Sequence, residues 1–245
     1  MNFDGLMKSE AWQVVHAVSE LHAERLKTMN FIRYRSIPGI VDRLTSDADP
    51  KVREVFKKAE EIRKEGKDIR HFFDIAVSLA LSQGLGEQVI KEMLKEPDPA
   101  TRTREPIDID NGSLRERLMS EAAVKPREDV FAVASKCILK DGTEAHIPMM
   151  DFSLKSPGGE EAVVTTMKSL LPSGGAVLQT KNSYHFYGVE LLDSKKWLAF
   201  LGESLLFQGI TDDRYIGHRL KEGFCVLRLS HGPFHDSVPT VVNTW

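Results

Sequence analysis

The chain has 245 residues, of which 41% are hydrophobic and 28% charged, so it can build an ordinary core and is too apolar for a disordered protein. A net charge of -3 and a pI near 6.3 exclude nucleic-acid binding through bulk positive charge. Two cysteines, Cys137 and Cys225, cannot form a disulfide framework, no apolar run approaches the roughly 20 residues of a membrane helix, and the N-terminus lacks the shape of a signal peptide. We therefore expect a soluble, cytoplasmic protein without membrane contact.

Charged residues are concentrated in the first half, and their spacing predicts a helical N-terminal region over residues 1–125. Apolar residues recur at helical spacing over 9–29, and further helices are predicted over 50–64, 68–83 and 86–95 and from Ser113 onward. The proline-rich segment 96–111 is interpreted as a linker or surface loop. This region is expected to serve as a scaffold and to dock a protein partner.

Residues 126–245 alternate between strand and helix patterns, with more glycine and aromatic residues. The Asp-Gly pair at 141–142 predicts a hairpin between its two flanking strands. Strands are predicted over 130–139, 145–152, 175–179, 184–191 and 224–229, and helices over 160–171, 194–207 and 213–221. The order predicts an α+β fold with helices packed on a sheet, and hence two domains, 1–125 and 126–245.

Three places in the second half interrupt the simple pattern. Asp151 ends an apolar strand, Ser183 and His185 project from one face of a later strand, and Asp212 precedes a helix. Taken singly, each has a plainer interpretation, as a turn or capping residue for the acids and a core residue for the histidine. Their order, acid, Ser-x-His, acid, is typical of polymerase-type sites, in which carboxylates hold Mg²⁺ or Mn²⁺ and the histidine contacts a triphosphate.

The segments HIPMMDF, SYHFYG and ITDDRYIGHRLKEGFCVLRLS give residues 146–230 a resemblance to the catalytic core of the archaeo-eukaryotic primase superfamily. Within that superfamily they resemble the primase 1D-like branch, which has a single aspartate in its first motif. The resemblance implies an RRM-like sheet and a metal-dependent nucleotidyltransferase that acts on nucleoside triphosphates and nucleic acid. Residues 1–125 carry no such resemblance.

The resemblance also implies roles for single residues. Asp151 corresponds to the first-motif metal ligand, and Asp212, with Asp213 as the alternative, to the acid of the third motif. Ser183 and His185 correspond to the contacts with the nucleoside triphosphate. Catalysis is therefore expected to depend on the first acid, the imidazole and the second acid, with Mg²⁺ or Mn²⁺ as cofactor.

One position departs from the superfamily pattern, since Ser153 stands where active members have a second acid. A neutral hydroxyl holds a divalent cation less well than a carboxylate does. The alternative hypothesis is therefore a weakened or inactive primase-like domain that binds nucleotide or nucleic acid as an interaction module. Arg219 and Arg228 are candidates for contact with phosphate or with the template, and Lys140 and Lys181 are weaker candidates.

Other motifs in the sequence are weaker evidence for a functional site. Asp108 and Asp110 form an Asp-x-Asp pair, but in a proline-rich segment with poor strand character. His231 and His235 have a zinc-like spacing without a cysteine pair to complete the site. P-loop, dinucleotide-binding and nucleophile-elbow motifs are absent from the sequence.

Overall fold

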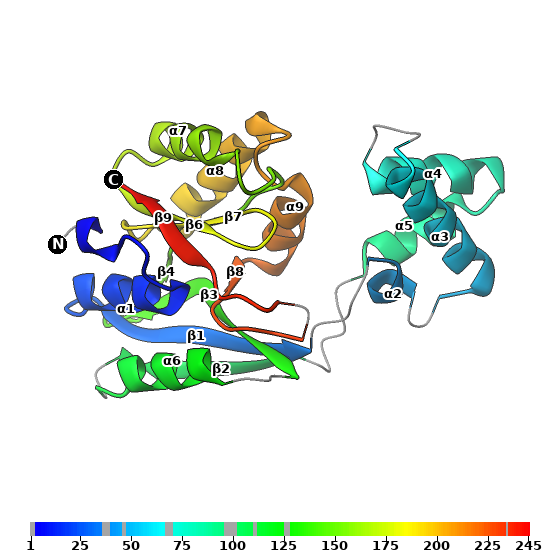
Figure 1. Cartoon of the computed structure of the whole chain (residues 1–245). Helices are drawn as coiled ribbons and strands as arrows, with labels where there is room; N and C mark the ends of the chain where they lie inside the picture. Colours follow the sequence, from blue (N-terminus) through cyan, green and yellow to red (C-terminus); the bar gives the residue numbers. More distant parts are fainter. Residues whose placement is uncertain are drawn as a thin grey trace. The chain divides into compact units, whose positions relative to one another are not determined.

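The computed structural model describes residues 3–35, 40–45, 48–66, 71–95, 102–109, 112–124, 128–233 and 235–245. Two compact units make up the chain (Figure 1). One consists of residues 1–36 together with 101–245, and the other of residues 37–100. This division differs from the predicted boundary at residue 125, a residue that lies outside the described ranges. The helical unit is thus an insertion within the larger one.

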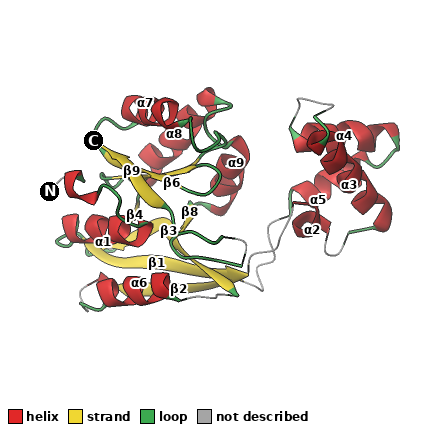
Figure 2. Cartoon of the chain, in the orientation of Figure 1, coloured by secondary structure: helices red, strands yellow, loops and turns green. Residues whose placement is uncertain are grey.

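The larger unit holds two antiparallel sheets, shown as yellow arrows in Figure 2. The first has the order β2-β1-β3-β4, with β8 also paired to β3, and consists of β1 (Leu26–Arg35), β2 (Arg102–Asp108), β3 (Asp129–Leu139), β4 (Glu144–His146) and β8 (Val226–Arg228). The second has the order β5-β7-β6-β9 and consists of β5 (Met149–Asp151), β6 (Gly175–Gln179), β7 (Tyr184–Gly188) and β9 (Thr240–Thr244). Helices and antiparallel sheets together confirm the α+β class.

Helices pack on both sheets of this unit: α1 (Ala11–Leu21), α6 (Leu114–Ala123), α7 (Glu160–Leu170), α8 (Ser194–Ser204) and α9 (Asp213–Glu222), with short 3-10 helices at Asp4–Leu6 and Leu205–Phe207. The side chain of Asp193 accepts a hydrogen bond from the Lys196 N–H and caps α8. One apolar core runs through the unit, and Phe31 and Phe131 stack within it at 5.3 Å. This continuous core supports both sheets.

Two segments of the N-terminal region form strands that the sequence analysis did not predict. Residues 26–29 were expected to end a helix, but they begin β1, which pairs with β2 on one side and β3 on the other. Segment 96–111 was expected to be a loop, but its described part contains β2. Pro106 is compatible with this strand because β2 lies at the sheet edge, where one row of N–H groups needs no partner. Tertiary pairing overrode local composition in both cases.

The second unit contains α2 (Ile40–Thr45), α3 (Pro50–Lys64), α4 (Phe72–Ser82) and α5 (Gly86–Met93). Asp49 caps α3 by accepting a hydrogen bond from the Lys51 N–H at 2.8 Å. Phe56 and Phe72 stack in its own core. The three longer helices confirm the predicted ones. No helix in the described ranges is both long and apolar enough to cross a membrane.

Gly175 on β6 provides a test of this packing. A Cβ atom there would lie 2.1 Å from Phe186 Cε2 and 2.9 Å from the Tyr187 carbonyl oxygen. We expect Gly175→Ala to lower the free energy of unfolding in urea by about 1–3 kcal/mol. The matched control is Gly202→Ala on α8, where nothing lies within 4 Å and helix propensity raises stability by about 0.5–1 kcal/mol. Equal effects of the two changes would contradict the described β6–β7 packing.

Candidate functional site

Backbone pairing brings the three predicted site residues together. Asp151, the last residue of β5, lies directly opposite His185 on β7. The Asp212 N–H donates a hydrogen bond of 3.1 Å to the Asp151 carbonyl oxygen. Between the side chains, His185 Nε2 lies 3.7 Å from Asp151 Oδ1. The ordered motifs of the sequence therefore converge on one place in the fold.

Each carboxylate also has a local structural task. Asp151 Oδ1 accepts a hydrogen bond of 3.0 Å from the Phe152 N–H. Asp212 is the N-cap of α9, and its Oδ1 accepts from the Tyr215 N–H at 2.9 Å. The capping role considered from the sequence is thus real for Asp212. It occupies one carboxylate oxygen and fixes where the other can point.

The electrostatic environment makes ionisation of Asp151 unfavourable. Its pKa is raised to about 7, chiefly by burial and then by the neighbouring charge of Asp212, while Arg228 and Arg219 oppose the rise. The side chain still keeps 33% of its surface exposed. The carboxyl group thus lies at the boundary between the protein interior and solvent, where a bound cation would relieve the repulsion between the two acids.

His185 is the buried member of the site. Its pKa is lowered to about 3, first by burial and then by the charges of Arg228 and His235, so the imidazole is neutral at pH 7. Within the described residues, its Nδ1 is buried without a hydrogen-bond partner. A neutral ring contributes a hydrogen bond to a ligand and no positive charge.

Positive charge comes from two buried arginines. Arg219 lies on α9, and Arg228 ends β8, where its Nη1 donates to the carbonyl oxygens of Ser230 and Ser237 at 2.8 and 2.6 Å. Both arginines lower the pKa of Asp151 and therefore act on the same site. These two predicted residues thus place cationic groups near the two acids.

Ser183 and Ser153 flank the site without a charged partner in the described structure. Ser183 directly precedes β7, and its Oγ lies 3.3 Å from Thr180 Oγ1. The Ser153 hydroxyl donates toward the carbonyl oxygens of Ile210 and Thr211 at 3.3 and 3.2 Å. Ser153 therefore ties the segment before Asp212 to the end of β5.

The donor set allows a limited kind of metal site. Asp151 and Asp212 offer two hard carboxylates, but the described residues contain no group of three or more His, Cys, Asp or Glu that could hold a metal. Mg²⁺ is commonly held by one or two carboxylates together with phosphate oxygens and water. Two carboxylates are therefore what the candidate site offers to such a cation among the described residues.

The weaker basic candidates have other surroundings. Lys181 Nζ pairs with Asp236 Oδ2 at 3.0 Å on an exposed surface. Lys140 is exposed at the end of β3, in the turn that leads to β4. The described partner of Lys181 is thus Asp236 and not a residue of the candidate site.

The competing acidic pair does not form a second site in the described residues. Asp108 ends β2 and accepts a hydrogen bond of 2.6 Å from the Thr28 hydroxyl on β1, and Asp110 lies outside the described residues. His231 and His235 lie in a turn closed by backbone pairing between Gly232 and His235. The two cysteines are buried as expected, and burial raises the pKa of Cys137 to about 12 and that of Cys225 to about 11.

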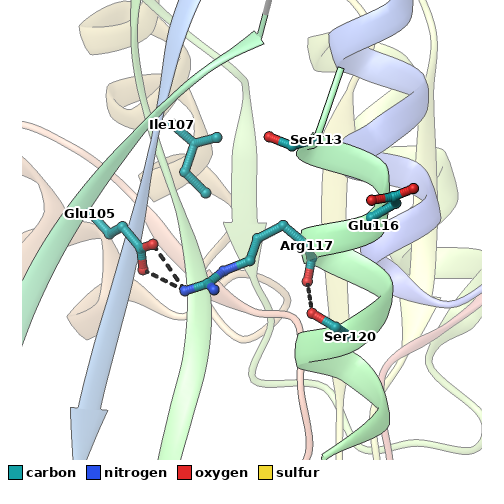
Figure 3. Close-up of a pocket in the computed structure, with 6 residues that line it drawn as sticks. All are labelled: Glu105, Ile107, Ser113, Glu116, Arg117 and Ser120. Carbon is teal, nitrogen blue, oxygen red and sulfur yellow. Dashed lines mark hydrogen bonds and ion pairs between the residues drawn. The ribbon is translucent and has the colours of Figure 1, made fainter. Parts of the chain in front are cut away.

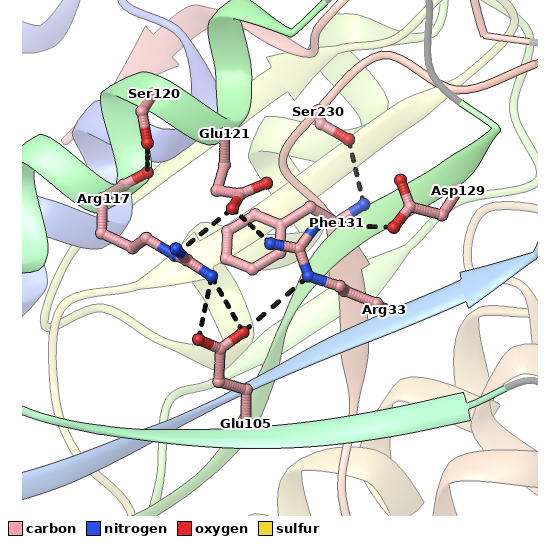
Figure 4. Close-up of polar contacts among 8 residues, drawn as sticks. All are labelled: Arg33, Glu105, Arg117, Ser120, Glu121, Asp129, Phe131 and Ser230. Carbon is pink, nitrogen blue, oxygen red and sulfur yellow. Dashed lines mark hydrogen bonds and ion pairs between the residues drawn. The ribbon is translucent and has the colours of Figure 1, made fainter.

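A cavity of about 470 Å³ lies elsewhere, between β2 and α6, and Figure 3 shows its lining residues: Glu105, Ile107, Ser113, Glu116, Arg117 and Ser120. Arg117 crosses it to pair with Glu105 at 3.0 Å. Arg33 joins the same group through Glu105, Glu121 and Asp129 (Figure 4). This network of two arginines and three carboxylates ties α6 to β1, β2 and β3.

Sequence reasoning missed two tyrosines near the site. Tyr187 on β7 has a buried hydroxyl without a hydrogen-bond partner in the described part of the chain, and the pKa of that hydroxyl is raised by burial and by Asp151 and lowered by Arg228. Tyr34 on β1 responds to the charges of Arg228 and Asp151 as well. The signal for Tyr34 was the aromatic and β-branched content of residues 26–35, which indicates a strand.

The three residues of the candidate site lie within a segment that matches a known protein family. A family model described as AEP-like, archaeo-eukaryotic primase 1D-like, matches residues 112–239, slightly more than half of the chain. The matched segment contains Asp151, His185 and Asp212 and extends beyond the stretch 146–230 on which the resemblance was based. No curated protein and no solved structure shows significant similarity to the chain.

The raised pKa of Asp151 predicts a pH-dependent effect of Asp151→Asn, which removes the charge and keeps an acceptor for the Phe152 N–H. Since the folded-state pKa is about 7 and the ordinary value 3.8, the wild-type protein loses stability as the pH rises between these values, and the variant does not. We expect the free energy of unfolding of Asp151→Asn, relative to that of the wild type, to increase by about 1–2 kcal/mol from pH 5 to pH 8. This value is smaller than the full pKa shift would give, because a third of the Asp151 side chain is exposed to solvent.

Urea denaturation at pH 5, 6, 7 and 8 measures this difference. Asp141→Asn serves as control, because hydrogen bonds from Thr143 lower the pKa of the exposed Asp141 and its contribution is constant above pH 5. An advantage of Asp151→Asn that stays constant over the same range would contradict the described environment.

Proposed function

Since the chain belongs to the archaeo-eukaryotic primase 1D-like family, we propose that it is a metal-dependent nucleotidyltransferase of the primase-polymerase type, which joins nucleotides on a nucleic-acid template. The primase-like fold follows from the family, and the activity is the proposal. One observation carries it: the pairing that sets Asp151 opposite His185 and beside Asp212, all within the matched segment.

The two carboxylates have the role of binding the metal. Asp151 and Asp212 would hold one Mg²⁺ or Mn²⁺, which when bound neutralises phosphate charge. Because a carboxylate must be deprotonated to bind a metal, the pKa of about 7 at Asp151 makes metal binding strengthen as the pH rises through neutrality.

The remaining residues orient the triphosphate. The neutral imidazole of His185 supplies a hydrogen bond at the buried end of the site, and Ser183 offers a hydroxyl from the start of the same strand. Arg219 and Arg228 supply the positive charge that attracts phosphate. Nucleoside triphosphates and a nucleic-acid strand are therefore the proposed ligands.

The second candidate is a non-catalytic member that binds nucleotide or nucleic acid within a larger system. Ser153 favours it, because this residue replaces an acid and its hydroxyl is turned to the backbone of Ile210 and Thr211. Nucleotide binding without incorporation, unaffected by a chelator, would support this alternative. A protein partner for the helical N-terminal region, residues 1–125, and a cytoplasmic location both stay predictions.

Incorporation of labelled nucleotide with Mn²⁺ tests the proposal. We expect Asp151→Asn and Asp212→Asn each to lower the rate by about 100-fold or more, because each removes one of two metal-binding charges. Asparagine keeps the oxygen that accepts from the Phe152 or the Tyr215 N–H, so the fold is preserved.

Asp213→Asn is the matched control, since Asp213 is adjacent in sequence and lies in the first turn of α9. We expect it to retain activity within about threefold of wild type, because the half-buried Asp213 lies in the first turn of α9 and its charge acts mainly on that helix terminus. If Asp213→Asn abolished incorporation and Asp212→Asn did not, the assignment of the second acid would move to Asp213. Incorporation that resisted both Asp151→Asn and metal removal would overturn the proposed function.

A further inference from the structure

Near the candidate site, three charged side chains from distant parts of the sequence form a chain of ion pairs. Arg102, the first residue of β2, pairs through Nη1 with Glu222 Oε1 at the end of α9. The second carboxylate oxygen of Glu222 lies 2.7 Å from Arg219 Nη1. Side-chain exposure is 4% for Glu222, 9% for Arg219 and 21% for Arg102. One carboxylate therefore holds two guanidinium groups away from water.

The balance of these charges has a consequence for anion binding. A buried Arg219–Glu222 pair alone would be neutral and would offer little attraction to phosphate. With Arg102 added, two positive charges face one negative charge, and the group keeps a net charge of +1. Arg219 Nε is also buried without a hydrogen-bond partner in the described residues, so the guanidinium keeps an unused donor.

Electrostatic coupling places this group in the environment of the candidate site. Arg219 lowers the pKa of Asp151. Tyr34, the cross-strand partner of Arg102, has a hydroxyl whose pKa is raised by burial and is lowered by Arg228, Arg102 and Arg219. The same hydroxyl responds to Asp151. Arg102 is therefore close enough to share one electrostatic environment with the acids and arginines of the site.

We propose that Arg102 and Glu222 are positioning residues for the triphosphate, with Glu222 fixing the guanidinium of Arg219 and Arg102 keeping the group cationic. This inference rests on the proposed function, because it assumes that Arg219 contacts phosphate. Arg102 lies outside the matched segment 112–239, on the strand that follows the helical insertion. The phosphate side of the site is therefore completed by a residue from the N-terminal region.

A double-mutant cycle on nucleotide affinity tests whether Arg102 acts through Arg219. Calorimetric titration with ribo- and deoxyribonucleoside triphosphates in the presence of Mn²⁺ gives Kd for the wild type, Arg102→Ala, Arg219→Ala and the double variant, the last made together with Glu222→Gln so that no carboxylate is left buried without a partner. We expect about a fivefold rise in Kd for Arg102→Ala, at least about a tenfold rise for Arg219→Ala, and no further rise beyond that of Arg219→Ala when both arginines are changed in this way. Arg102→Lys, which keeps the charge, should restore about half of the lost affinity on a logarithmic scale.

Arg104→Ala is the control, because Arg104 lies two residues along the same strand and stacks on Phe224 at 4.7 Å. It should leave Kd within about twofold of wild type. Thermal unfolding of every variant separates loss of structure from loss of binding. Glu222→Gln tests the positioning role by a second variant, and we expect it to lose more affinity for triphosphate than for monophosphate.

The outcomes are distinct. If the wild type binds triphosphate and the effects of Arg102→Ala and Arg219→Ala simply add, or Arg102→Ala changes stability alone, the positioning role is wrong while the proposed function stands. If the wild type binds no triphosphate in the presence of Mn²⁺, both proposals fail. A saturated cycle together with rescue by lysine supports the positioning role.

Discussion

The antiparallel pairing of β5 with β7 fixes the position of the candidate site, since it places Asp151 opposite His185. The segment before α9 then pairs with the end of β5, so that the Asp212 N–H reaches the Asp151 carbonyl oxygen. In a sheet, a shift of one residue in register turns each side chain to the other face. Buried neighbours on β5 and β7, including Met149, Met150 and Phe186, oppose such a shift. Site geometry is therefore a consequence of core packing.

Charge arrangement gives this geometry its chemical character. Two acids lie close enough to raise the pKa of one of them, while two buried arginines act on the same carboxyl group. Acidic and basic groups in one place suit a ligand that itself combines a cation with phosphate. The imidazole of His185 is neutral because burial, and then the charges of Arg228 and His235, lower its pKa. Such a site is costly to the fold without its ligand, which is typical of functional sites.

Short motifs, with residue types in a fixed order, led to the prediction of Asp151, His185 and Asp212 as site residues. The family match confirms the family that those motifs suggested. β1 and β2 were missed because their strand character depends on pairing between segments separated by the helical insertion, a relation that local periodicity does not carry. For the same reason Arg102 could not be connected with Glu222 before the fold was known. Pairing between segments that are distant in the sequence could therefore not be predicted from local sequence patterns.

Diffraction from crystals soaked with Mn²⁺ and a non-hydrolysable nucleoside triphosphate would show whether Asp151 and Asp212 share a metal ion. We expect an anomalous manganese peak within about 2.5 Å of carboxylate oxygens of both Asp151 and Asp212, with phosphate density near His185 and Arg219. Nucleotide bound elsewhere, for example in the cavity between β2 and α6, with no manganese at the two acids, would contradict this expectation.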